Sequence, residues 1–383
     1  MELKRLNKSN YDELIALMNF VFSNKDKREH SFEADLPSMC RRTDEAMNKH
    51  LGVFEDGKLV AALGIYPLPC KIFGEDFLFS TVGNVATHPD YEGRGYMGIM
   101  MNAAMEELER IGADASRLGG ARQRYNRFGY EMAGVAYKFT IIDHNTKHAF
   151  GDIGDYTFER IERENTDAFL YVKSLHEKEK IYAKRSSDED CFGVWASAVA
   201  WQSVPYIVKK NGKRVGYVSI AKDEVTVSEL YAESEDVFVE ALVAYQRKIK
   251  KAIFVRLPDY EPALLSRLAA FAHDVTTSPV CRFKIINFAD ITDALMKLKA
   301  SYTDMPDGEF LLGIKDYGTL RLYAKDGKAG AELCEGDASI ILDKLAATRL
   351  LFGHTPATLI ADVPQFVRLW LPLPLYWNLQ DRV

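Results

Sequence analysis

One arrangement of secondary structure is encoded twice in the chain, and this repeat constrains the fold more than any other feature. Residues 53–65 contain two β-rich runs joined at Asp56-Gly57, a dipeptide typical of tight hairpins. Residues 207–220 have the same layout around an Asn-Gly-Lys turn. We interpret the repeat as a duplicated α/β unit; the alternative is coincidence, because hairpins with Asn-Gly are common.

The elements that follow each hairpin also come in the same order. After the first hairpin, the pattern predicts a strand over residues 77–87 and a helix over residues 96–111. The methionines of that helix recur at helical spacing, which favours a core-facing stripe over a binding surface. After the second hairpin, a strand over residues 224–231 and a helix over residues 237–250 are predicted.

The two copies differ where the strand joins the helix. The first join reads Tyr-Glu-Gly-Arg-Gly-Tyr-Met-Gly over residues 91–98, and the second reads Ala-Glu-Ser-Glu-Asp over residues 232–236. Backbone N–H groups at a helix N-terminus attract anions, and glycines let a phosphate approach closely. The second join has three carboxylates and no glycine, so it would repel a phosphate. We therefore expect an anion site in the first copy only.

A third unit follows the two copies. The chain has 383 residues, 47% hydrophobic and 27% charged, and one domain per ~150 residues gives two or three domains. From about residue 287 the pattern changes and predicts a small α+β domain. Its short strands are expected over residues 308–316, 318–323 and 330–334, and its helical stretches over residues 338–351 and from residue 357 onward.

Charge and hydropathy exclude several classes of protein. Lys+Arg number 49 against 55 Asp+Glu, a formal net charge of −6. Such a chain lacks the basic footprint of a general nucleic-acid binder and suits a cationic substrate better. No apolar run approaches the ~18 residues of a membrane span, and the first residues lack the apolar segment of a secretory signal. We expect a soluble cytoplasmic protein with no nucleic-acid partner and no membrane span.

The residues that could bind a metal are dispersed. The five cysteines form no CxxC pair, and the eight histidines form no HExxH or HxH motif. We therefore expect reduced thiols, no disulfide framework and no metal.

The stretch that carries the chemistry runs from residue 85 to residue 98. A strand ends, a turn with Gly93 and Gly95 follows, and an amphipathic helix begins, an arrangement suited to holding a pyrophosphate. The Walker pattern is absent because no GK[ST] follows, and the GxGxxG fingerprint of dinucleotide-binding folds is absent too. A bare Gly-x-Gly turn is more often simply a turn.

Two motifs give the turn a context. The turn resembles motif A of the GCN5-related N-acetyltransferases (GNATs), [Q/R]-x-x-G-x-[G/A]. It departs from that pattern at Glu92 and Met97 and keeps the central Gly95. About thirty residues on, Tyr-Asn-Arg-Phe-Gly-Tyr over residues 125–130 looks like the Y-x-R-F-G-Y segment of the Eis-like branch of that superfamily.

The resemblance covers nearly the whole chain. It implies an α/β (α+β) fold of tandem GNAT-type mixed sheets with flanking helices and a C-terminal domain like sterol carrier proteins. The corresponding ranges are 1–148 for an N-terminal acetyltransferase domain, 149–285 for a second, degenerate one, and 286–383 for the sterol-carrier-like domain. The family also assembles as hexamers, which implies a homo-oligomer.

The resemblance assigns roles to individual residues, with acetyl-CoA as co-substrate. Tyr125 matches the tyrosine that protonates the departing thiolate; the alternative is that it only packs. The branch uses the chain's own C-terminal carboxylate as the base, here that of Val383. The apolar, proline-containing tail over residues 371–379 is expected to dock and place it, or else the end frays. The residues expected at the cofactor are Val85, Ala86 and Thr87 on the strand and Gly93, Arg94, Gly95, Tyr96, Met97 and Gly98 in the turn, while Glu92 is expected to point outward.

Two functions of different classes remain open. The first is an N-acetyltransferase that moves acetyl from acetyl-CoA to a primary amine, on an aminoglycoside- or polyamine-like small molecule or on a lysine. The second is a non-catalytic carrier or sensor of acyl-CoA or lipid. The glycine turn together with Tyr125 favours the enzyme. A structural assembly with no ligand does not explain why one copy keeps its glycines.

Overall fold

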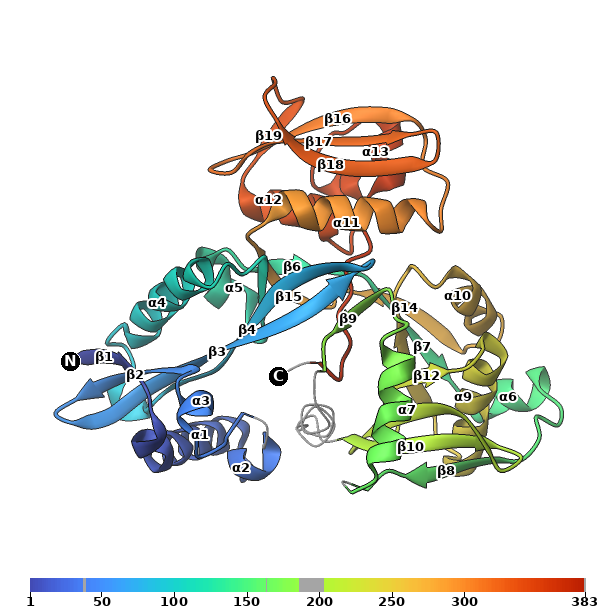
Figure 1. The fold of residues 1–383 in the computed structure, drawn as a ribbon, viewed down its shortest axis with the longest axis horizontal. Helices are drawn as coiled ribbons and strands as arrows, with labels where there is room; N and C mark the ends of the chain where they lie inside the picture. Colours follow the sequence, from blue (N-terminus) through green and yellow to red (C-terminus); the bar gives the residue numbers. More distant parts are fainter. Residues whose placement is uncertain (37–38, 163, 186–202, 382–383) are drawn as a thin grey trace.

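The computed structural model describes residues 1–36, 39–162, 164–185 and 203–381, which form three sheets with helices packed on them (Figure 1). The expected mixed α/β fold class is confirmed. Within the described ranges, no helix is both long and apolar enough to cross a membrane.

The first sheet has the strand order β1-β2-β3-β4-β5-β15-β6, and β9 pairs with β3. Only β4 and β5 are parallel along this path. Helix α4 (Tyr96–Arg110) covers one face and α1 (Tyr11–Asp26) the other (Figure 1). The strands are β1 (Glu2–Arg5), β2 (His50–Glu55), β3 (Lys58–Ile72), β4 (Glu75–Thr87), β5 (Ala115–Leu118), β6 (Glu131–Ala133), β9 (Ile181–Ala183) and β15 (Cys281–Ile285), and the short helices are η1 (Lys8–Asn10), α2 (Phe32–Asp35), α3 (Asp44–Met47), η2 (Pro89–Tyr91), α5 (Arg122–Tyr125) and η3 (Asn126–Phe128).

The second sheet repeats the first. Read from β8, its order is β8-β10-β11-β12-β13-β7-β14, and only β12 and β13 are parallel. The same strand directions in the same order support the predicted duplication. The strands are β7 (Ala136–Ile141), β8 (Tyr156–Arg160), β10 (Ser203–Lys210), β11 (Lys213–Ala221), β12 (Thr226–Ala232), β13 (Ile253–Leu257) and β14 (Asp274–Ser278), and the helices are α6 (Asp143–Ala149), α7 (Thr166–His176), α9 (Glu235–Ile249) and α10 (Pro262–Ala269).

The two sheets exchange one strand each. In the first sheet, the strand between β5 and β6 is β15, which follows all strands of the second sheet in the chain. In the second sheet, the strand between β13 and β14 is β7, which precedes all other strands of that sheet. Neither sheet is therefore complete without a strand from the other half of the chain.

The C-terminal third forms a four-stranded sheet of order β18-β17-β16-β19. The three predicted strands are confirmed, but the helix predicted over residues 338–351 is wrong at its start. Residues 340–342 pair in parallel with β16, and the helix begins only after Asp343, whose carboxylate accepts the N–H of Ala346 at 2.7 Å. The elements are α11 (Phe288–Ala300), β16 (Gly308–Ile314), β17 (Gly318–Lys325), β18 (Lys328–Cys334), β19 (Ile340–Leu342), α12 (Lys344–Phe352), η4 (Ala357–Leu359) and α13 (Gln365–Trp370).

The C-terminal tail runs back between the two exchanged sheets (Figure 1). Leu373 and Leu375 are fully buried, so the predicted docking of this segment is confirmed. The ring of Trp377 stacks on Phe79 of β4 with centroids 5.3 Å apart, and the Tyr376 hydroxyl donates to the carbonyl of Arg256 of β13 at 3.4 Å. The tail therefore contacts both sheets.

The chain crosses from the first sheet to the second at Gly134. Its N–H donates to the carbonyl of Phe352 at 2.7 Å, so the C-terminal third supports the crossing. The φ angle of Gly134 is +80°, and a Cβ there would lie 2.7 Å from Cβ of Val280 and 2.9 Å from the carbonyl oxygen of Leu375. Glycine is required both for the left-handed backbone and for the close approach.

We expect Gly134→Ala to lower the free energy of unfolding by at least ~2 kcal/mol, because backbone strain and overpacking add. Urea unfolding followed by circular dichroism measures this. Gly212→Ala is the matched control, since Gly212 has a φ of +77° with no atom within 4 Å of a Cβ; it should cost only the left-handed backbone term. Equal losses in the two variants would contradict the proposed role of the crossing.

Candidate active site

Strands β4 and β5 begin as a parallel pair and then separate. They are paired only from Phe79 to Thr81 on β4, opposite Ala115 to Arg117 on β5. Beyond Thr81, β4 continues to Thr87 while bonding only β3, through pairs such as Ala86 with Ala62. Among the residues that the structure describes, the second edge of β4 therefore has no strand partner over the segment that contains Val85, Ala86 and Thr87. A free edge of this kind can accept an extended ligand that forms backbone hydrogen bonds.

The separation begins beside a bulge held by buried side chains. Asn84 has a φ of +54°, and the register of β3 with β4 shifts at this point. The Asn84 amide donates to the Tyr66 hydroxyl at 2.7 Å, and that hydroxyl lies 2.8 Å from Nε2 of His50. Nδ1 of His50 donates to the carbonyl of Ala46 at 3.2 Å, so Nε2 accepts the proton of Tyr66. Burial lowers the pKa of His50 to about 4, which keeps the ring neutral at physiological pH.

The glycine turn leaves room for a ligand at the start of α4. Gly93 and Gly95 have φ angles of +77° and +80°, and no atom lies within 4 Å of a Cβ on either. Within the described ranges no side chain caps the first turn of α4, so its backbone N–H groups are available to an anion. Glu92 is exposed, as predicted.

Arg94 forms an ion pair with Glu55 at the end of β2. Its guanidinium donates to both carboxylate oxygens of Glu55, at 2.8 and 3.0 Å. The Tyr96 hydroxyl donates to the same carboxylate, and this hydrogen bond raises the pKa of Tyr96. The ion pair between Arg94 and Glu55 holds the turn against the end of β2. It also neutralises part of the positive charge of Arg94.

Tyr125 is buried together with residues of α4. It belongs to the buried cluster around α4 that includes Tyr96, with Val85 and Met97 packed against it. Only 5% of Tyr125 is exposed, and burial raises the pKa of its hydroxyl against the opposing effect of Arg124. The hydroxyl is therefore protonated at physiological pH, as a proton donor requires. The sequence motifs at residues 85–98 and 125–130 thus meet in space.

Arg127 is a candidate that sequence reasoning missed. Its Nη2 lies 3.9 Å from the position of a Cβ on Gly98, in the first turn of α4. It is exposed and makes no ion pair with a residue that the structure describes; its guanidinium lies over the ring of Phe128. The arginine of the Tyr-Asn-Arg-Phe-Gly-Tyr segment was the available signal, because it supplies a positive charge beside the glycine turn.

The last described residue of the tail, Asp381, is fixed near the point where β4 and β5 separate. Its carbonyl accepts the indole N–H of Trp377 at 2.9 Å and also a hydrogen bond from Arg117, the last paired residue of β5. Its carboxylate accepts from Arg185 at 2.8 Å, and Arg185 also binds Glu229. Val383 lies outside the described residues.

Comparisons with known proteins agree with this geometry. Residues 2–133 match the family model of the acetyltransferase (GNAT) domain. The fold of the chain is similar to that of Eis1 from Mycobacterium abscessus (14% identity, TM-score 0.69, 100% of both chains covered). It is also similar to a GCN5-related N-acetyltransferase from Anabaena variabilis (15% identity, TM-score 0.67, 98% of both chains). A probable N-acyltransferase from Enterococcus faecalis gives 16% identity and a TM-score of 0.66, with 98% of this chain and 99% of that one covered.

At these identities the solved structures show the fold alone, and no curated protein matches the sequence. Residues 2–133, which supply α4 and most strands of the N-terminal sheet, match the acetyltransferase (GNAT) domain. The match extends to residue 133 and thus contains the glycine turn, the separated strands and Tyr125.

We expect Tyr66→Phe to destabilise the protein by ~1–3 kcal/mol, because it leaves the buried Nε2 of His50 without a donor. Urea unfolding measures the change. Tyr323→Phe is the control, since the Tyr323 hydroxyl makes no hydrogen bond with the described residues. Wild-type stability of Tyr66→Phe would mean that the His50, Tyr66 and Asn84 chain does not hold the bulge.

Proposed function

We propose that this protein is an N-acetyltransferase that moves the acetyl group of acetyl-CoA to a primary amine. The observation that carries the proposal is the free edge of β4 ending at an open glycine turn, with the protonated hydroxyl of Tyr125 in the same buried cluster. The match of residues 2–133 to the GNAT domain supports the reaction class.

The proposed cofactor contacts follow the two parts of the site. Val85, Ala86 and Thr87 offer backbone groups of β4 to the pantetheine arm. The backbone N–H groups from Gly93 to Gly98 hold the pyrophosphate, and Arg127 adds a positive charge from the adjacent segment. The cofactor contacts that we propose in the turn remain those expected from the sequence: Gly93, Arg94, Gly95, Tyr96, Met97 and Gly98.

The proposed chemistry is a single acyl transfer. The neutral amine nitrogen attacks the thioester carbonyl carbon, the C–N bond forms, and the C–S bond breaks. Tyr125 donates its proton to the departing sulfur, and the proton that the nitrogen loses as the amide forms restores the neutral Tyr125 hydroxyl. The ammonium form of the acceptor first gives up a proton, and we assign that base to the C-terminal carboxylate of Val383. Asp381, two residues earlier, lies beside β5, which supports this assignment.

The proposed acceptor is cationic: an aminoglycoside- or polyamine-like small molecule or a lysine side chain, consistent with the net charge of −6. From the resemblance of the sequence to the Eis-like branch, we also propose that the C-terminal domain is sterol-carrier-like and that the protein is a cytoplasmic homo-hexamer. An amine panel assayed by thiol release separates the transferase from a carrier or sensor, which would bind acetyl-CoA without turnover.

We expect Gly95→Asp to weaken acetyl-CoA binding at least tenfold, about 1.4 kcal/mol. The substitution puts a negative charge where the pyrophosphate is proposed to lie, in a position with open space. Isothermal titration calorimetry measures the affinity. Gly74→Asp, at a turn with a φ of +86° and open space, is the control and should bind normally. Unchanged affinity in folded Gly95→Asp would remove the pyrophosphate assignment.

Tyr125→Phe should lower kcat by ~10²–10⁴-fold with acetyl-CoA affinity close to that of the wild type, because it removes only the proton donor. Single-turnover kinetics isolate the chemical step, and calorimetry reports binding. Wild-type kcat with chemistry rate-limiting would leave Tyr125 as a packing residue.

Extending the C-terminus by a few residues should abolish turnover, because it moves the carboxylate away from the acceptor. Melting temperature and acetyl-CoA affinity should change little. A C-terminal amide, made by semisynthesis, is the more conservative change and should behave in the same way. Full activity in either form would send the search for the base to Asp and Glu side chains.

A further inference from the structure

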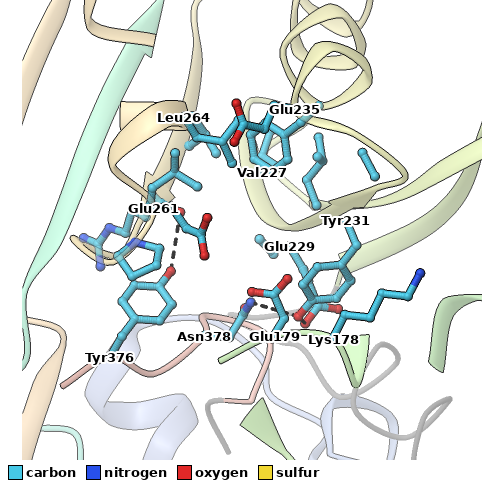
Figure 2. A pocket seen from close by; sticks show the side chains of 18 of the residues that line it. Lys178, Glu179, Val227, Glu229, Tyr231, Glu235, Glu261, Leu264, Tyr376 and Asn378 are labelled. Atoms are coloured by element: carbon cyan, nitrogen blue, oxygen red, sulfur yellow. Dashed lines mark hydrogen bonds between the residues drawn. The ribbon is translucent and has the colours of Figure 1, made fainter. Parts of the chain in front are cut away.

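The second sheet contains a cavity at the position that corresponds to the free edge of β4 in the first sheet. Strands β12 and β13 are paired only at Thr226 with Phe254 and Val227 with Val255, and then they separate as β4 and β5 do. A cavity of about 280 Å³ lies in this opening. That volume is just below the ~300 Å³ at which sites for drug-sized ligands begin, so it suits a smaller molecule. It is lined by β12, β13, the start of α9, the segment around Glu261, Lys178 and Glu179 just after α7, and the tail (Figure 2).

The charges around this cavity are opposite to those that a phosphate needs. The first turn of α9 carries Glu235 and Asp236, and its N-cap is the side chain of Ser234, which accepts the N–H of Val237 at 3.3 Å. An anion would therefore meet carboxylates and a capped helix end. Glu229 and Glu261 also line the cavity, although each has a cationic partner, Arg185 and Lys180 respectively.

Glu179 differs from these because its carboxyl group makes no hydrogen bond or ion pair with any residue in the described ranges, while its backbone N–H donates to the carbonyl of His176 at 3.1 Å. Its carboxyl group faces the cavity, and the residue as a whole is half-buried. Burial, then the carboxylates of Glu261 and Glu229, raise the pKa of Glu179 to about 8, and Lys180 opposes them. The other polar groups at this end are Tyr231 on β12, Asn378 on the tail and Lys178 beside Glu179, with Arg256 lining the cavity from β13. A ligand that brings a cation would stabilise the ionised form of such a carboxyl group.

We propose that this cavity is a binding site for a small aliphatic amine, with its primary ammonium group on Glu179. Figure 2 places Glu179, Tyr231 and Asn378 at one end of the cavity and Glu235 with Leu264 at the other. Val227, Phe238 and Leu264 are apolar residues of the lining against which a short alkyl chain can pack. A diamine can direct its second ammonium group toward Glu235, whose carboxylate also lies 3.8 Å from Arg267. The proposal does not depend on acetyl transfer, since the cavity lies in the second sheet.

Calorimetric titration of the full chain with 1,4-diaminobutane, without acetyl-CoA, tests the site. 1,4-Butanediol, which has nearly the same length and no charge, should not bind. Glu179→Gln should weaken diamine binding at least tenfold. Glu177→Gln is the matched control: Glu177 is exposed, lies two residues away, does not line the cavity and pairs with Lys173 at 3.8 Å. Equal loss in both variants would overturn the proposal, because it would indicate a general charge effect.

A second readout distinguishes this site from an acceptor site in the first sheet. With a pKa of about 8, Glu179 is mostly protonated at pH 7, so an ammonium bound to its carboxylate should displace close to one proton per diamine. Titrations in buffers of different ionisation enthalpy count these protons. Leu264→Trp, which fills the apolar wall, should abolish the same binding event and its proton release. Wild-type isotherms in both Glu179→Gln and Leu264→Trp would show that the diamine binds elsewhere.

Discussion

The exchange of strands β7 and β15 is the constraint on which the rest of the molecule depends. Each exchanged strand is hydrogen-bonded on both sides within the sheet of the other half of the chain. Withdrawing either would leave buried backbone groups without partners along two ladders at once, which is costly. The two halves therefore cannot separate without breaking both sheets, and the positions of the two strand openings are fixed relative to each other.

The boundary between the two sheets that exchange strands also holds the tail as far as Asp381. The tail is buried between the sheets, and Asp381 completes a buried charge network with Arg185 and Glu229. Burial opposes ionisation of Glu229, but Arg185 prevails and holds the pKa of that carboxyl below its usual range. Paired charges of this kind do not add much net stability, but removing one partner is severely destabilising. The network therefore fixes Asp381 beside Arg117, near the separation of β4 from β5.

Sequence reasoning was successful where the determinants are local and failed where they are not. Hairpin dipeptides and helical periodicity predicted the duplicated elements, and the joins between strand and helix predicted their difference in charge. The helix expected from residue 338 began later, because pairing of residues 340–342 with β16 overrides local propensity. The exchange of β7 and β15 had no local signal, since strand partners come from remote parts of the chain. Glu179 was missed for the same reason: only the fold encloses it.

We propose that one fold was duplicated and that only the first opening kept a site for acetyl-CoA. Counting acetyl-CoA bound per chain, by equilibrium dialysis at saturating ligand with native mass spectrometry as a check, tests this most directly. We expect one molecule per chain. Two molecules per chain would contradict the loss of the anion site in the second copy, and none would contradict the site in the first.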